Sequence, residues 1–130
     1  MPAEPQVGAI DSREVAVAAA RTASAKQASR VVILDVRELI VITDYFVIAS
    51  GSSDRQVKTI LEEVDKALRL LGVRPVRTEG EPEAGWVLLD YIDAVVHVFA
   101  EEEREYYDLE RLWRDAPKVS WEDPNAATSG

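Results

Sequence analysis

The sequence has no cysteine and only one histidine among its 130 residues. The absence of cysteine excludes disulfide bonds, thiolate metal sites and cysteine nucleophiles. No apolar run approaches the ~20 residues needed to cross a bilayer, and the first residues lack the basic start and apolar stretch of a secretory signal. We therefore expect a cytoplasmic protein that does not bind membranes.

Basic side chains are also scarce, because Lys and Arg total 15 against 24 Asp and Glu, a formal net charge of −9. Residues 1–30 hold three acidic and four basic side chains, which leaves 21 acidic and 11 basic ones for residues 31–130. Binding to a phosphate backbone depends on Lys and Arg. The acidic body therefore argues against direct nucleic-acid binding as the main mode and favours a basic protein partner.

The composition fits one compact domain, since 47% of the residues are apolar and 30% are charged. We expect residues 1–10 to form a disordered N-terminal tail and residues 11–116 to form the domain. Residues 117–130 are expected to be a C-terminal tail, in which Val119 and Trp121 are suited to contact the body.

The clearest local signal is a helix between residues 53 and 72. Ser53 and Gln56 have the spacing of a capping box, and Gly72 suits the left-handed residue that ends a helix. The apolar residues between them recur at helical spacing on one face: Val57, Ile60, Leu61, Val64, Leu68 and Leu71.

Two further helices are predicted near the ends of the domain. The Ala-rich residues 15–28 follow Asp11 and Ser12, either of which can cap a helix. Residues 101–115 begin with acidic side chains, as the helix dipole favours, and end before Pro117. The apolar residues of this last helix are expected on one side: Tyr106, Leu109, Leu112 and Trp113.

Five short segments have the composition of strands: residues 31–36, 44–50, 75–79, 86–90 and 94–100. Only Tyr91, Ile92 and Asp93 separate the last two, which predicts an antiparallel hairpin. Helices separate the strand pairs, so the predicted fold class is α/β in the broad sense (α+β). It is a single domain with a mixed β-sheet flanked by helices.

Two features suggest a nucleotide-dependent enzyme, but each has a simpler interpretation. The turn at residues 51–53 can cradle a phosphate, yet it lacks the lysine of a P-loop, and a tight turn with a capping serine is favoured. Asp90 and Asp93 can be imagined holding Mg²⁺. Carboxylates that bond backbone N–H groups to shape the turn are favoured there.

The histidine and the tryptophans also have structural alternatives. His97 shares a strand face with Val95 and Phe99, so a packed side chain with one satisfied nitrogen is favoured over a catalytic base. Trp86 suits a core or an interface equally, and Trp113 suits the core.

Several blocks of the sequence, taken in order, resemble one family. The blocks are residues 43–51 with Ser53, Arg55, Gln56 and Val57; Glu79 and Gly80; residues 86–91; Asp93; residues 95–99; Arg104; residues 106–110; and Leu112 and Trp113. Together they resemble the ribosomal silencing factors, bacterial proteins related to plant Iojap. The resemblance covers about residues 12–116.

The resemblance implies a fold similar to nucleotidyltransferases without their active site, and hence no catalysis, cofactor or metal. It implies a homodimer when the protein is free. It also implies binding to the large ribosomal subunit through ribosomal protein fourteen, which sterically blocks association with the small subunit. Translation would then be repressed during starvation or stationary phase. An active nucleotidyltransferase is the alternative function.

The resemblance also implies where the partner docks. The residues expected to bind the ribosomal protein are Trp86, Asp90, Tyr91 and Asp93, with Arg104 and Tyr107 close by. One departure is Ile92, since many relatives have glycine at this position. The turn must therefore take another geometry or be strained.

Overall fold

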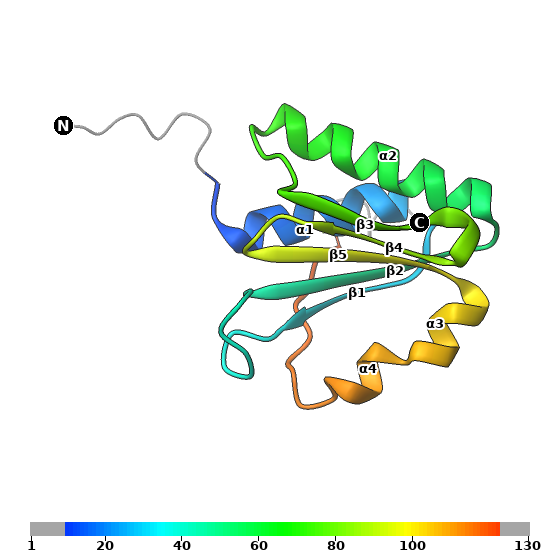
Figure 1. Cartoon of the computed structure of the whole chain (residues 1–130). Coiled ribbons are helices and arrows are strands. Elements are labelled where there is room, and N and C mark those ends of the chain that lie inside the picture. Colours follow the sequence, from blue (N-terminus) through cyan, green and yellow to red (C-terminus); the bar gives the residue numbers. More distant parts are fainter. Residues whose placement is uncertain (1–9, 123–130) are drawn as a thin grey trace.

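The computed structural model describes residues 10–122 of the chain. Its centre is a five-stranded sheet in the order β1-β2-β5-β4-β3, with helices on both faces (Figure 1). Strands β2 and β5 are parallel, and the other neighbours are antiparallel, so the sheet is mixed as predicted. The strands are β1 Ser29–Asp35, β2 Tyr45–Gly51, β3 Arg77–Glu81, β4 Trp86–Asp90 and β5 Ala94–Ala100.

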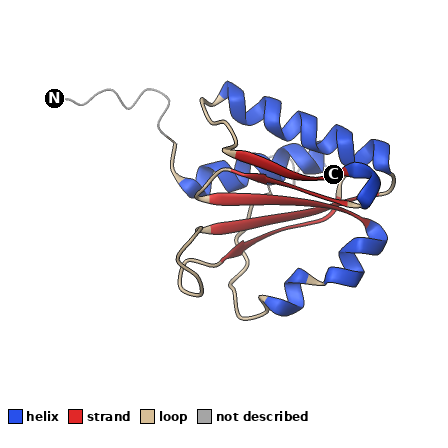
Figure 2. Cartoon of the chain, viewed as in Figure 1, coloured by secondary structure: helices blue, strands red, loops and turns tan. Residues whose placement is uncertain are grey.

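Helices α1 and α2 cover one face of the sheet, and α3 and α4 lie on the other side (Figure 2). The helices are α1 Ser12–Ala25, α2 Asp54–Leu70, α3 Glu101–Tyr107 and α4 Leu109–Leu112, with a short 3-10 helix η1 at Pro82–Ala84. Asp11 caps α1 in a complete capping box with Glu14. Within residues 10–122 there is no helix with the length and apolar character to cross a bilayer.

Helix α2 begins and ends as predicted. The hydroxyl of Ser53 accepts a bond from the backbone N–H of Gln56, and Gly72 after the helix has φ 85°. The Gln56 side chain does not complete the capping box, because its Oε1 accepts from the N–H and the hydroxyl of Ser52 and not from the N–H of Ser53. Its Nε2 donates to the carbonyls of Lys26 and Gln27 at the end of α1. This bond ties the start of α2 to the end of α1.

The prediction of one helix over residues 101–115 was wrong. Asp108 has φ 48° and ends α3, and the chain restarts as the short helix α4. The expected apolar side is divided as well, since Tyr106 and Leu112 are exposed while Leu109 and Trp113 pack against the sheet. Asp tolerates the left-handed conformation better than most residues, so it suits this break.

Residues 117–122 run beside β1 and belong to the packed body, which therefore extends past residue 116. The backbone of Val119 donates to the carbonyl of Ile33, and the Trp121 indole donates to the carbonyl of Val31. Val119 and Trp121 thus contact the body as the sequence suggested. The rest of the two predicted tails, residues 1–9 and 123–130, lies outside the described residues.

Candidate partner-binding surface

The six residues expected to bind the partner do not form one cluster. Side chains alternate along β4, so Trp86 and Asp90 point to the same face of the sheet, at opposite ends of the strand. Five residues of strand span ~17 Å. The α3 end of the sheet therefore holds Trp86, Arg104 and Tyr107, and the turn end holds Asp90, Tyr91 and Asp93.

At the α3 end, Trp86 and Tyr107 form a pair that we call the aromatic patch. Their ring centroids lie 4.6 Å apart, and the half-buried Trp86 also stacks on Phe99 at 5.1 Å. Tyr107 keeps 45% of its surface exposed. Aromatic rings that are fixed by packing and still reach solvent are typical anchors of protein interfaces.

His97 on the neighbouring strand β5 fixes the orientation of Trp86 through a hydrogen bond. The Trp86 indole N–H donates to His97 Nδ1 over 3.2 Å, and Nε2 is buried without a hydrogen-bond partner among the described residues. Burial lowers the pKa of His97 to about 4, so the ring is neutral at pH 7. The interpretation of His97 as a packed residue with one satisfied nitrogen is therefore confirmed.

Arg104 on α3 offers no surface to a partner, because only 1% of it is exposed. Its guanidinium donates to Ser50 Oγ and to the carbonyl of Arg30, each over 2.7 Å, and to both carboxylate oxygens of Glu110 over 2.9 and 3.0 Å. Bonding by Arg104 holds the pKa of Glu110 below its usual value. The ion pair joins α3 to α4 across Asp108 and so fixes the end of α3, the helix that carries Tyr107.

Acidic side chains border the aromatic patch on two sides. A hollow of about 170 Å³ beside Trp86 is lined by Glu79, Gly80 and Leu88. A second hollow, of about 430 Å³, is lined by Glu102, Glu103 and Tyr107, together with Ala84 and Tyr106. Glu79, Glu102 and Glu103 were not among the expected binding residues, although the run of carboxylates after β5 was a signal for the last two.

At the turn end, the Asp90 carboxylate shapes the hairpin. It accepts the backbone N–H of Ile92 over 2.8 Å and lies 3.2 Å from the guanidinium of Arg77. The favoured interpretation of this carboxylate as a turn-forming group is thus confirmed for Asp90. Asp93 is exposed, and its backbone carbonyl accepts the N–H groups of Asp44 and Tyr45.

Tyr91 points to the opposite face of the sheet from Trp86. It is buried against α2, where its hydroxyl donates to Asp65 over 3.4 Å. Burial is the main reason why the pKa of Tyr91 is raised. Tyr91 therefore anchors the turn to the core and presents no surface to a partner.

Ile92 carries the strain that its sequence position suggested. Its φ is 74°, and the backbone N–H of Asp93 bonds back to the carbonyl of Tyr91, which makes a tight three-residue turn. A β-branched residue in this conformation costs on the order of 1–3 kcal/mol. Even so, 56% of Ile92 is exposed.

Of the groups considered for nucleotide chemistry, Ser52, Ser53 and Asp90 are occupied by internal bonds. In the turn at residues 51–53, the N–H of Ser52 donates to Gln56 Oε1 over 2.6 Å, and Ser53 caps α2. The interpretation as a turn with a capping serine is confirmed. Within residues 10–122, no group of three or more His, Cys, Asp or Glu side chains is arranged to hold a metal ion.

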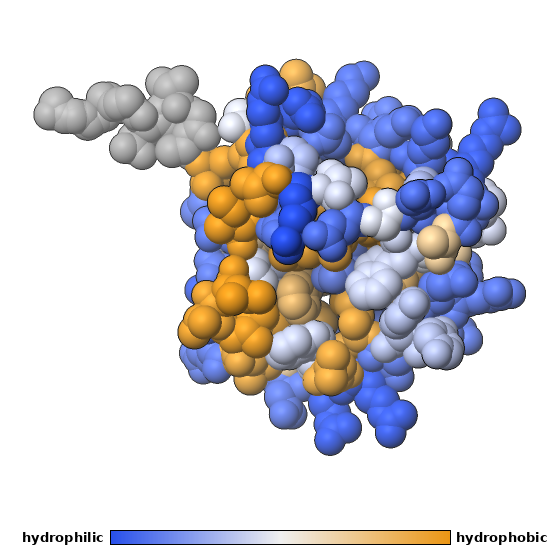
Figure 3. Space-filling model, in the orientation of Figure 1, coloured by the Kyte–Doolittle hydropathy of each residue, from blue (hydrophilic) through white to orange (hydrophobic). Residues whose placement is uncertain are grey.

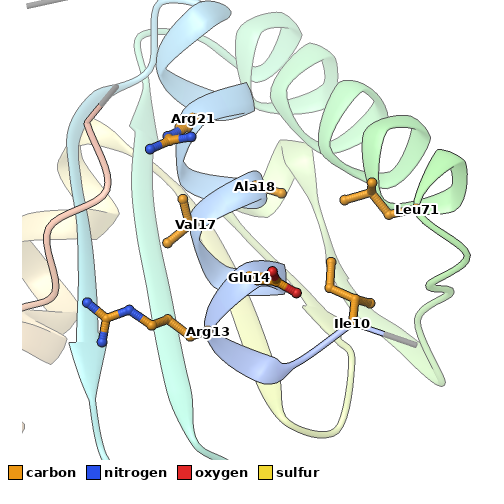
Figure 4. A pocket seen from close by; sticks show the side chains of 7 residues that line it. All are labelled: Ile10, Arg13, Glu14, Val17, Ala18, Arg21 and Leu71. Atoms are coloured by element: carbon orange, nitrogen blue, oxygen red, sulfur yellow. The ribbon is translucent and has the colours of Figure 1, made fainter. Parts of the chain in front are cut away.

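A mostly apolar hollow lies elsewhere, between α1 and the end of α2 (Figure 4). It encloses about 550 Å³ and is lined by Ile10, Arg13, Glu14, Val17, Ala18, Arg21 and Leu71. Figure 4 shows Arg13 extending away from Ile10 and Leu71, so its guanidinium does not converge with the Glu14 carboxylate. No His, Ser or Asp lines this hollow, and it contains none of the expected binding residues.

Comparison with known proteins identifies the family. The family model for "Ribosomal silencing factor during starvation" matches residues 9–130. Ribosomal silencing factor RsfS of Halalkalibacterium halodurans is 41% identical over 113 residues, which are 87% of this chain and 97% of that protein. RsfS of Bacillus subtilis is 40% identical over 108 residues, 83% of this chain and 92% of that protein.

A solved structure has the same fold. The crystal structure of protein CV0518 from Chromobacterium violaceum superposes with a TM-score of 0.77 at 33% identity, covering 85% of this chain and 92% of that one. The mixed sheet and its helices, the sequence match over nearly the whole chain and the relatives' shared name agree. The chain therefore belongs to the ribosomal silencing factor family.

Proposed function

We propose that this protein binds the large ribosomal subunit through ribosomal protein fourteen and sterically blocks its association with the small subunit. Translation would be repressed in this way, chiefly in starvation or stationary phase. Membership of the silencing factor family supports a role at the ribosome. The observation that carries the proposed contact is the aromatic patch of Trp86 and Tyr107, bordered by the carboxylates of Glu79, Glu102 and Glu103.

The chemistry of this surface suits a basic ribosomal protein. Burial of the exposed part of Tyr107 and of Trp86 would provide desolvation energy at the centre of the contact. Glu102 and Glu103, which form no ion pair within residues 10–122, would attract Lys and Arg side chains and raise the association rate, whereas Glu79 is paired with Arg77. Asp93 adds an exposed carboxylate at the turn after β4, whereas Asp90 is already paired with Arg77. Tyr91 and Arg104 are buried, so they would support the contact only by fixing the β4–β5 turn and the junction of α3 with α4.

We further propose that the protein works as an obstacle in the cytoplasm, without catalysis, and that it forms a homodimer when free. The bonds already made by Ser52, Ser53 and Asp90 favour binding over nucleotide transfer. Titration with nucleoside triphosphates and Mg²⁺ in a calorimeter tests this point. Heat of binding together with turnover of the nucleotide would contradict it.

Pelleting with purified large subunits tests the proposed contact. Tyr107→Ala removes an exposed ring, and Glu102→Lys reverses a charge at the rim, so each should weaken binding roughly tenfold or more. Glu62→Lys is the matched control, because Glu62 is an exposed carboxylate on α2, away from the patch. All three variants should remain folded at the assay temperature, which circular dichroism checks, with only the two patch variants losing packing or helix-dipole stabilisation. If Tyr107→Ala and Glu102→Lys pelleted as well as the control, the aromatic patch would not be the contact.

A further inference from the structure

The end of the sheet opposite α3 carries an unusual number of exposed apolar side chains. The loop between β1 and β2 exposes 44% of Leu39, 99% of Val41 and 78% of Ile42, and the β4–β5 turn exposes 56% of Ile92. Figure 3 shows hydrophobic side chains gathered over this loop and turn, at the left of the view. We call these four residues the apolar tip. A run of exposed apolar residues costs solubility, so its presence points to a contact.

The apolar tip is held in a fixed shape. Val36 closes the loop by bonding to the carbonyl of Asp44 and by accepting the N–H groups of Leu39 and Ile40. Ile40 packs into the second core cluster. The N–H groups of Asp44 and Tyr45 both bond to the carbonyl of Asp93, which joins the loop to the β4–β5 turn. Side chains on such a frame lose little freedom on binding.

Ile92 gives an independent reason to infer a contact. Its backbone conformation is strained for a β-branched side chain, and its side chain is largely in solvent, so packing within the chain does not account for the isoleucine. Strain that persists at an exposed position is explained if the side chain is used by a partner.

The charges around the apolar tip select the partner's chemistry. Glu38, Asp44 and Asp93 adjoin it, and none of these three forms an ion pair within residues 10–122. The one arginine in the loop, Arg37, is already bonded to both carboxylate oxygens of Asp35, over 2.9 and 2.7 Å. A second copy docked tip to tip would bring like charges together, whereas a basic surface would neutralise them.

We infer that the apolar tip is a second contact with the same protein partner. The partner would present an apolar surface bordered by basic side chains to it. This inference rests on the proposed function and adds a region that the aromatic patch does not include. Asp90 and Asp93 would then lie between the two contacts, at the turn end of β4.

Binding of purified large subunits to two variants tests the inference. Ile92→Gly removes the side chain and relieves the strained φ, so its urea midpoint should equal or exceed that of the wild type. Its affinity should nevertheless fall roughly fivefold. The double variant Val41→Gln/Ile42→Gln changes no charge and should bind roughly tenfold more weakly or worse. Leu70→Gln is the control, since Leu70 is 82% exposed on α2.

The possible failures are distinguishable. If the tip variants bind as the control does while Tyr107→Ala binds weakly, the apolar tip is not a contact and the proposed function stands. If the wild type does not bind large subunits, the proposed function and this inference both fall. If the tip variants bind normally but sediment as monomers where the wild type is a dimer, the occupant is a second copy and the inference of a basic partner is overturned.

Discussion

Removal of Glu110 should destabilise the protein by leaving a buried positive charge without its counterion. In the wild type, Arg104 is buried and makes four hydrogen bonds, two of them to Glu110. Glu110→Ala would leave the guanidinium with two neutral acceptors. Breaking a buried ion pair in this way costs about 3–5 kcal/mol. The Glu110 side chain is 26% exposed, so we expect the lower end, about 3 kcal/mol.

The double variant Arg104→Met/Glu110→Ala separates this cause from a general loss of packing. Arg104→Met removes the buried charge, so the double variant should recover part of the stability that Glu110→Ala loses. Glu105→Ala is the matched control, because Glu105 pairs with Arg30 at the surface over 3.6 Å. Exposed pairs contribute little, so its effect should stay below about 1 kcal/mol. Urea unfolding followed by tryptophan fluorescence measures all four proteins.

The same pair makes a prediction about pH. Because the pKa of Glu110 is lowered in the folded protein, the stabilisation is present above the unfolded pKa and is lost as the pH falls through the folded value. The difference between wild type and Glu110→Ala should therefore shrink in acid. An equal difference at pH 7 and pH 3, or a double variant no more stable than Glu110→Ala, would refute the reasoning.

Two other predictions concern His97 and Gly80. The pKa of His97 is about 4 in the folded protein and 6.5 in the unfolded chain. Between about pH 7.5 and 5 only the unfolded chain takes up the proton, so the protein should lose about 2 kcal/mol of stability over this range. His97→Gln should lack this loss, and equal pH slopes in the two proteins would contradict the burial. Gly80 has φ 91°, and an added Cβ would lie 2.1 Å from the carbonyl oxygen of Trp86. Gly80→Ala should lower the free energy of unfolding by about 2 kcal/mol or more, whereas Thr78→Ala on the same strand should change it little. Equal melting temperatures for the two variants would show that β3 adapts to the added Cβ.

Much of the fold could be predicted from local patterns. Strands β4 and β5 begin and end where their composition indicated, and α2 begins after its capping serine. Strand β3 begins and ends two residues later than predicted. It is an exposed edge strand, so it has no alternation of buried and exposed residues from which its ends could be predicted. The break at Asp108 was missed because helical spacing counts apolar residues and does not register a single left-handed residue between two helices.

The surface was harder to predict than the fold. Arg104 was expected at the docking surface from the family resemblance alone, but it is buried by bonds to Ser50 and Arg30, which lie 54 and 74 positions away in the sequence. Tyr91 was expected beside Trp86, and the tight turn after β4 directs it into the opposite core. Residues 39–42 lie in the loop between β1 and β2, and their local pattern does not separate the packed Ile40 from the exposed Leu39, Val41 and Ile42.

The most direct test of the proposed function is a subunit-joining measurement. Purified large and small subunits are mixed at a magnesium concentration that allows them to join, and light scattering follows the joined particle as this protein is added. We expect the joined fraction to fall with increasing protein and to recover with Tyr107→Ala. If the subunits join to the same extent at saturating wild-type protein, this chain does not block their association.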